Sequence, residues 1–457
     1  MSKRNLILLI IILSLGTIVF FGFLYFNKPT NTTNDNTQDT NFFSQFGLFG
    51  TKKPPITIIP PKKIPDQPNP PENTQNTKLN KISSMPIAGF TIFNKERLKN
   101  IPAVTTSENT GAIATTTKTS TPTVKTKKPT PPPTEFVPAL RYVEKATGNV
   151  YQTFIDKIEE RKFSTTIIPK VYDAYFGNNG ESVFMRYLKL DGRTIETFLG
   201  TLPKELLGGD TTENNEIKGV FLPNNITDIS ISPDSSGIFY LFNNQNNGNE
   251  NIIGTTLNLK TNKKIQIFDS PFTEWLSSWP NKDIVTLTTK PSASIPGYMY
   301  SMDASGKNLT KILGDINGLT TLESPNGKLI LFSNTESSYN LTLNLYHTDT
   351  RNSDLLSLKT LPEKCVWNRT NEFIYCAVPK SAPIGEYPDT WYQGEVSFND
   401  QIWKIEVKTG NTTLILDPST SVGGEDIDGI KLALDADENN LFFVNKKDYF
   451  LWRVSLK

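Results

Sequence analysis

The chain has 457 residues, with 47 Lys and Arg against 46 Asp and Glu, and a formal net charge of +1. This balance, with no basic stripe interleaved with aromatic residues, argues against nucleic acid as a partner. One histidine, His347, and two cysteines, Cys365 and Cys376, are too few for a structural zinc site, which needs four such ligands. We therefore expect no metal and no cofactor.

An apolar run near the N-terminus predicts a membrane anchor. Residues 6–26 carry no charge and are long enough to cross a hydrocarbon core of about 30 Å. Lys3 and Arg4 lie just before the run, which favours a cytoplasmic location for residues 1–5. The run has no small-x-small cleavage site, so we expect an uncleaved signal anchor in the cell membrane, with the rest of this single-pass protein outside the cytoplasm. A cleaved signal and a free secreted protein is the alternative.

Residues 27–77 are rich in Asn, Thr and Pro and contain the pairs Pro54-Pro55, Pro60-Pro61 and Pro70-Pro71. A segment of this composition cannot bury a core, so it predicts a disordered stalk.

A pattern of strand, polar corner and strand recurs through residues 78–457. Its clearest copies are Ser232-Pro233-Asp234 and Ser324-Pro325-Asn326, each placed between apolar runs. Looser copies have their central position at 178, 280, 369 and 436. Many of the spacings are close to 45 residues, and a period of about 45 with four short strands per unit is typical of a β-propeller.

The two ends of this region are expected to close the propeller. An aliphatic-aromatic pair marks the third strand of a unit, and the chain ends soon after such a pair at Leu451-Trp452. Residues 78–83 match residues 308–313, which occupy the position of an outermost strand. Pairing of residues 78–83 with the last unit would remove a free edge. The sequence thus predicts an all-β protein with seven four-stranded blades.

The first blade contains a long insertion. Residues 86–93 suit an innermost strand, whereas residues 94–135 include Thr115-Thr116-Thr117 and a proline-rich stretch. We interpret residues 94–135 as a disordered, low-complexity insertion between the first and second strands of this blade.

The corners and third strands resemble the bacterial TolB-like propeller repeat, a relative of the WD-repeat family that lacks its Gly-His and Trp-Asp marks. The resemblance covers about residues 78–457 and implies the propeller fold. Members of that family bind proteins or serve as accessory domains of peptidases, so the resemblance implies no single activity.

The loop at residues 380–400, between a second and a third strand, holds the candidate binding residues Tyr387, Asp389, Trp391 and Tyr392. Aromatic side chains in a surface loop can stack on a sugar or grip a partner protein. They can also fold back and become buried on their own blade. Alternation of strand direction predicts that this loop lies on the face away from the stalk.

Other candidates have simpler interpretations. Asp234 at a corner suits an Asx turn better than a calcium site. His347 occupies a strand position where the other units have Ser, Lys or Arg, so a solvated side chain is expected. Cys365 and Cys376 flank one corner and form either a disulfide or two small buried residues.

These features favour a non-catalytic, surface-displayed binding or scaffold protein with a protein or glycan partner in the cell envelope. The alternative is a glycan-acting hydrolase or lyase with carboxylates on the distal propeller face, for which Glu386, Asp389 and Glu395 are the candidates.

Overall fold

The computed structural model describes residues 78–99, 132–207, 215–246, 249–335, 340–383, 385–421 and 424–457. The predicted anchor at residues 6–26 and the predicted stalk at residues 27–77 lie outside these ranges. Within the described ranges, no helix combines the length and apolar character that crossing a membrane requires.

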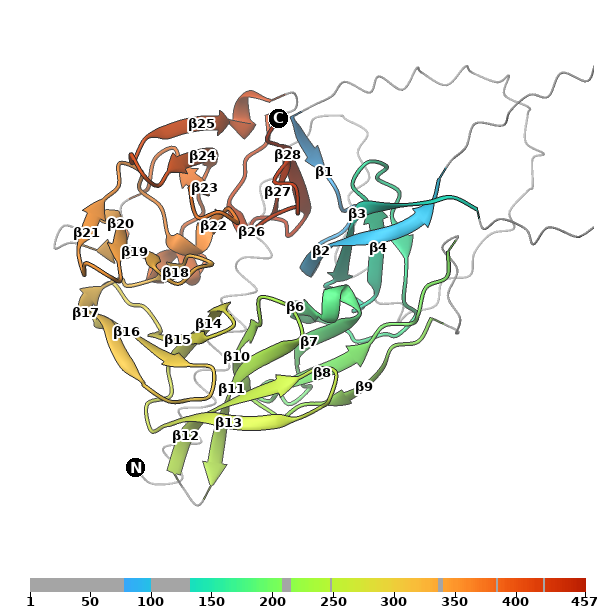
Figure 1. Ribbon diagram of the computed structural model, residues 1–457, viewed down its shortest axis with the longest axis horizontal. Helices are drawn as coiled ribbons and strands as arrows, with labels where there is room; N and C mark the ends of the chain where they lie inside the picture. Colours follow the sequence, from blue (N-terminus) through green and yellow to red (C-terminus); the bar gives the residue numbers. More distant parts are fainter. Residues whose placement is uncertain are drawn as a thin grey trace, which may run out of the picture. The chain divides into compact units, whose positions relative to one another are not determined.

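The described residues form seven four-stranded antiparallel sheets arranged around a common centre, which is a seven-bladed β-propeller (Figure 1). Blade 1 contains β2 (Ile87–Leu98), β3 (Thr134–Glu144), β4 (Val150–Phe154) and β5 (Arg161–Lys162). Blade 2 contains β6 (Val171–Gly177), β7 (Ser182–Leu188), β8 (Ile195–Thr201) and β9 (Lys218–Phe221). Blade 3 contains β10 (Ile226–Ile231), β11 (Gly237–Asn246), β12 (Asn249–Asn258) and β13 (Lys264–Ser270).

The remaining blades follow the same order from the innermost to the outermost strand. Blade 4 contains β14 (Trp275–Asn281), β15 (Ile284–Thr289), β16 (Pro296–Asp303) and β17 (Thr310–Asn317). Blade 5 contains β18 (Thr321–Glu323), β19 (Leu329–Thr335), β20 (Leu341–His347) and β21 (Ser353–Leu355). Blade 6 contains β22 (Cys365–Trp367), β23 (Phe373–Pro379), β24 (Asp400–Glu406) and β25 (Thr412–Leu416).

Blade 7 is built from both ends of the propeller region. It contains β26 (Gly429–Leu434), β27 (Asn440–Asn445) and β28 (Leu451–Ser455), and its outermost strand is β1 (Leu79–Lys81). Leu79 pairs with Val454 and Lys81 with Trp452 in an antiparallel register. The ring therefore closes by strand pairing, as the sequence predicted.

The corners lie between the first and second strands of the blades. In the corner after β10, the Asp234 carboxylate accepts hydrogen bonds from Ser232 Oγ at 2.7 Å and from Ser236 N at 3.0 Å. These bonds lower the pKa of Asp234 and form the turn. Asn326 makes the same contacts with Ser324 and Lys328, so Pro-Asp and Pro-Asn corners share one local structure.

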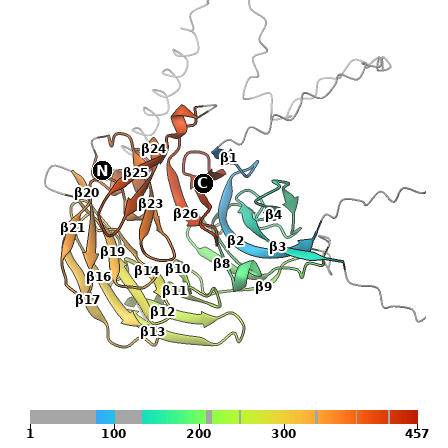
Figure 2. The ribbon, with the colours of Figure 1, turned by 45° about the horizontal axis from the view of Figure 1, so that its top comes forward.

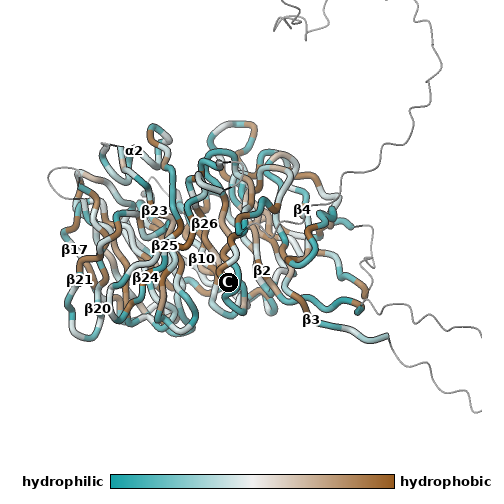
Figure 3. Tube along the Cα trace, turned by 90° about the horizontal axis from the view of Figure 1, so that it is seen from above, coloured by the Kyte–Doolittle hydropathy of each residue, from teal (hydrophilic) through white to brown (hydrophobic). Residues whose placement is uncertain are grey.

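The two faces of the propeller carry different connections. We call the face with the corners the corner face, and the opposite face, where second strands connect to third strands and innermost strands begin, the loop face. Figure 3 shows this disc from its side, with α2 (Asp389–Tyr392) at the edge that belongs to the loop face.

The hairpin of blade 1 extends further than the sequence indicated. β2 and β3 stay paired as far as Leu98 and Thr134, and both strands reach outward from the ring (Figures 1 and 2). Residues 94–98 and 134–135, which the sequence analysis assigned to the insertion, therefore belong to strands. Most of the predicted insertion, residues 100–131, lies outside the described residues.

The hydrophobic core lies mainly between neighbouring sheets. In blade 6, for example, Trp367, Ile374 and Ile405 pack with Leu331 and Leu343 of blade 5. The same cluster contains Cys365 and Cys376, which pair in register on β22 and β23. Their sulfur atoms are 2.10 Å apart, so the structure contains a disulfide bond between them.

Candidate functional site

The loop that the sequence singled out connects β23 to β24 and lies on the loop face. Of its aromatic side chains, Tyr387 is 1% exposed and Trp391 is 4% exposed, whereas Tyr392 is 43% exposed. The sequence left open whether these aromatic residues contact a partner or are buried on their own blade. The structure shows that Tyr387 and Trp391 are buried. Tyr392 is the aromatic side chain of this group that a partner can reach.

The buried aromatic residues form a small core of their own. The ring centroid of Phe398 lies 5.5 Å from that of Tyr387 and 6.0 Å from that of Trp391, and Leu341 and Leu361 complete the cluster. Each such side chain contributes roughly 2 kcal/mol or more by leaving water, which holds the loop against blades 5 and 6.

Backbone contacts fix the same loop to its neighbours. Asp389 Oδ2 accepts a hydrogen bond from Ala293 N in blade 4 at 2.6 Å, and Tyr387 O accepts one from Thr335 Oγ1 in blade 5 at 2.8 Å. Lys446 Nζ of blade 7 donates to Trp391 O. The predicted site residue Asp389 is thus engaged in a structural contact, while the enzyme candidates Glu386 and Glu395 are exposed.

A fully buried ion cluster lies beneath this loop. Lys364, the last residue of the 3₁₀ turn η3 (Pro362–Lys364), has 0% side-chain exposure, as have Asp400 and Asp428. Lys364 Nζ lies 2.5 Å from Asp428 Oδ1 and 2.8 Å from Asp400 Oδ2. Asp428 also accepts hydrogen bonds from Trp391 Nε1 at 2.9 Å and from Phe398 N at 3.1 Å. The cluster therefore ties the loop to the starts of β22, β24 and β26.

The two carboxyl groups of this cluster have shifted pKa values in opposite directions. Burial raises the pKa of Asp400 to about 6, because few donors offset its loss of water and Oδ1 has no hydrogen-bond partner. Asp428 loses water as well, but the Lys364 ammonium and several donors hold its pKa below the ordinary value. The carboxylate of Asp428 is thus firmly ionised within this cluster.

The loop-face ends of the innermost strands, which we call the inner ring, form a second polar site. The innermost strands of blades 1, 2, 3 and 7 each have a register shift near this end, at 87–89, 171–173, 226–228 and 430–433. Such bulges re-aim side chains and are common beside functional sites.

The bulges bring charged residues of different blades together. Lys431 Nζ of β26 crosses β2, where it donates to Ala88 O at 2.9 Å, and reaches Asp173 Oδ1 of β6 at 2.6 Å. Arg186 NH1 contacts the other oxygen of Asp173 at 3.1 Å. Asp228 on β10 accepts hydrogen bonds from Ser277 N at 2.6 Å and Ser277 Oγ at 2.7 Å. Burial nevertheless raises the pKa of Asp228.

An aromatic pocket of about 560 Å³ opens on the loop face of blade 4. Phe272 is 46% exposed and Ile295 is 66% exposed, while Trp275 forms its floor at 8% exposure. The ring of Trp275 stands at 83° to that of Phe272 and at 79° to that of Tyr300. The loop between β15 and β16 lines one side of this pocket and also contacts Asp389 through Ala293 N. We call this cavity the blade 4 pocket.

Several polar side chains around the blade 4 pocket already have partners within the protein. Trp275 Nε1 donates to Phe272 O at 2.9 Å, and the Tyr298 hydroxyl donates to Asp315 Oδ1 at 2.7 Å. Lys290 Nζ and Glu274 Oε2 at its rim form an ion pair at 2.5 Å. These polar side chains already have partners within the protein, and the lining of the pocket is mainly apolar.

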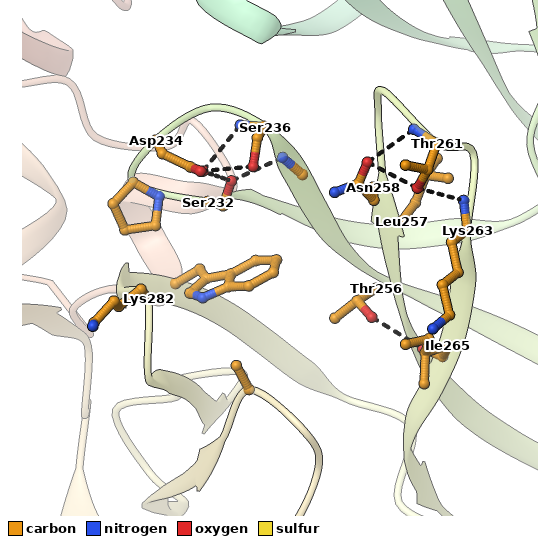
Figure 4. Close-up of a pocket in the computed structure, with 14 residues that line it drawn as sticks. Ser232, Asp234, Ser236, Thr256, Leu257, Asn258, Thr261, Lys263, Ile265 and Lys282 are labelled. Carbon is orange, nitrogen blue, oxygen red and sulfur yellow. Dashed lines mark hydrogen bonds between the residues drawn. The ribbon is translucent and has the colours of Figure 1, made fainter.

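A further cavity, of about 540 Å³, lies on the corner face between blades 3 and 4 (Figure 4). Asp234, Ser232 and Ser236 form one of its walls, and Figure 4 shows that their polar atoms bond to one another within the corner. This wall has a structural role, as the Asx-turn interpretation predicted.

His347, the remaining candidate of the sequence analysis, lies on the third strand of blade 5. His347 Nε2 lies 2.9 Å from Asp354 Oδ2 on the outer strands of blade 5, where the histidine side chain is 32% exposed. Among the described residues, no group of three or more His, Cys, Asp and Glu side chains is placed to hold a metal ion.

Comparison with known proteins shows similarity in fold alone. No family model and no curated protein sequence matches the chain. The oligogalacturonate lyase of Vibrio parahaemolyticus superposes with a TM-score of 0.46 and 10% identity, over 69% of this chain and 85% of that chain. An oligogalacturonate lyase in complex with manganese gives a TM-score of 0.47 and 11% identity, over 70% of this chain and 85% of that chain. TolB of Acinetobacter baumannii superposes with a TM-score of 0.36 and 11% identity, over 68% of this chain and 60% of that chain. At these values the TolB-like resemblance extends no further than the propeller.

Proposed function

We propose that this propeller is a non-catalytic binding or scaffold protein, displayed outside the cytoplasmic membrane, whose loop face holds a partner protein. The blade 4 pocket carries the proposal. It exposes Phe272 and Ile295 in a concave apolar surface, a feature that marks interaction sites on proteins.

The chemistry of the blade 4 pocket favours a protein over a glycan. A sugar needs hydrogen-bond partners for its hydroxyl groups, and the groups around Trp275 and Tyr298 are bonded to other residues. An apolar side chain of a partner needs only the apolar area. Tyr392, on the same face, is a further aromatic contact for such a partner.

Two features support display outside the cytoplasm. The apolar run at residues 6–26 suits an anchor. The bond between Cys365 and Cys376 suits an oxidising compartment, because disulfides are rare in proteins of the cytosol.

Replacing Phe272 by Ala and Ile295 by Ser together is expected to weaken partner binding more than tenfold, because anchors in such pockets contribute roughly 2 kcal/mol or more. The melting temperature should change by no more than a few degrees, since Ile295 is 66% exposed and Phe272 is 46% exposed. Leu355→Ser is the matched control, because Leu355 is 70% exposed on the outermost strand of blade 5. Quantitative co-purification with the full-length protein from envelope extract measures the effect. Equal recovery of the same partners by the double variant and wild type would contradict the proposal.

One observation favours the alternative of a glycan-acting enzyme. Asp228 in the inner ring has a raised pKa, as a general acid requires, and Asp173 supplies a second carboxylate on the neighbouring innermost strand. Turnover of cell-wall glycans by the purified protein, lost in Asp228→Asn with the fold intact, would favour this function over binding alone.

A further inference from the structure

We propose that the ammonium group of Lys364 condenses with the carboxylate of Asp428 in the folded protein, so that an isopeptide bond joins the two side chains. This bond links blade 6 covalently to blade 7, because Lys364 immediately precedes β22 and Asp428 immediately precedes β26. It concerns how the ring is held together and not what the loop face binds. Its test needs no partner, so its failure would leave the binding proposal intact.

The surroundings of the two groups favour an amide over an ion pair. The side chains of Lys364, Asp400 and Asp428 are all 0% exposed. The Lys364 ammonium also lies 5.0 Å from the ring centroid of Trp391 and 5.2 Å from that of Phe398. Hydration stabilises separate ions in water, and burial removes this stabilisation. Condensation leaves one buried charge in this cluster in place of three, because the amide is neutral.

The structure shows Lys364 and Asp428 in the arrangement of the reactants. Lys364 Nζ lies 2.5 Å from Asp428 Oδ1, and groups held in such contact react as if at a concentration on the order of 10⁵ M or more. The other oxygen, Oδ2, accepts hydrogen bonds from Trp391 Nε1 at 2.9 Å, Phe398 N at 3.1 Å and Ser397 Oγ at 3.2 Å. Attack of the nitrogen on Cγ places negative charge on Oδ2, where these three donors stabilise it.

Asp400 is placed to carry the proton rather than to be attacked. Its Oδ2 lies 2.8 Å from Lys364 Nζ, so it can accept a proton from the ammonium directly. Its Oδ1 has no hydrogen-bond partner, and an attack on Asp400 would therefore leave the developing charge without donors. Burial raises the pKa of Asp400 to about 6, which makes it a stronger base than an ordinary carboxylate. These differences assign the electrophile to Asp428 and the base to Asp400.

The condensation balances without any further reagent. Asp400 accepts one proton from the ammonium, and the resulting amine of Lys364 attacks Cγ of Asp428. The bond from Nζ to Cγ forms, the bond from Cγ to Oδ1 breaks, and Oδ1 leaves as water. This water carries two of the three ammonium protons, one of them returned by Asp400, which is thereby regenerated. The third proton stays on the amide nitrogen, which keeps Gly429 O as its acceptor, 3.1 Å from Nζ.

Mass spectrometry of the denatured full-length protein tests the bond, because denaturation separates an ion pair but leaves an amide intact. The wild type should weigh one water molecule less than its sequence with the disulfide formed. Lys364→Met should have the full mass of its sequence, and so should Asp400→Asn, which removes the base. Lys380→Met is the matched control and should retain the loss of water, because Lys380 is 31% exposed and pairs with Asp417 instead.

Digestion with trypsin after reduction of the disulfide locates the bond. Trypsin should no longer cleave after Lys364, and residues 360–369 should be recovered joined to residues 409–431. A wild-type protein with its full mass, or a loss of water that maps to another pair of residues, would overturn the proposal. Loss of water in Asp400→Asn would overturn the assignment of the base. If Lys364→Met fails to fold, the wild-type peptide map decides alone.

Discussion

Deletion of residues 78–83 is expected to lower the free energy of unfolding of the propeller by roughly 4 kcal/mol or more. β1 is short, but it closes the ring. Leu79 is 8% exposed and Ile82 is 3% exposed, so the deletion removes two buried apolar side chains from blade 7. It also leaves the β28 edge open, because Ile82 N donates to Leu451 O at 2.7 Å and Leu451 N donates to Ser83 Oγ at 2.9 Å.

A matched deletion in the predicted stalk separates closure from chain length. Removal of residues 70–75 should leave the free energy of unfolding, measured with denaturant, close to that of wild type. Leu79→Ser should fall between the two deletions, since it keeps the backbone pairing and loses the apolar contact. An unchanged stability after deletion of residues 78–83 would show that β1 does not hold the ring together.

The fold was predictable because its corners are local. Ser232, Asp234 and Ser236 form their turn through bonds that span no more than two positions, so the sequence alone displays them. Closure by β1 was predictable for a similar reason, since a missing outermost strand at one end matched a spare strand at the other. The length of the blade 1 hairpin could not be predicted, because the paired residues Leu98 and Thr134 belong to segments whose sequence has no strand pattern.

The candidate site was less predictable because its contacts are distant in the chain. Nothing in the loop sequence tells whether Trp391 points to solvent or to Asp428, its hydrogen-bond partner 37 positions away. Lys364 and Asp428 are separated by 64 positions and match no motif. The blade 4 pocket likewise combines the connection before β14 with the loop between β15 and β16.

Replacing Lys364 by Met is expected to cost about 3–5 kcal/mol of stability at neutral pH, because it leaves two fully buried carboxylates without their cation. Met fills a similar volume, so the loss reports charge rather than packing. Lys380→Met is the matched control in blade 6, where Lys380 pairs with Asp417 at 2.7 Å but is 31% exposed. That exposed pair should contribute no more than about 1 kcal/mol.

The pH dependence of Lys364→Met distinguishes an unpaired charge from a general packing defect. Without the ammonium, the pKa values of Asp400 and Asp428 should both lie above their unfolded values, so the folded variant binds more protons than the unfolded chain. Its deficit relative to wild type should therefore shrink as the pH falls from 8 to 5, and Asp400→Asn with Asp428→Asn should recover part of it. Denaturant unfolding at several pH values measures this, and a deficit below 1 kcal/mol, or one that is independent of pH, would mean that the cluster does not hold the loop by charge.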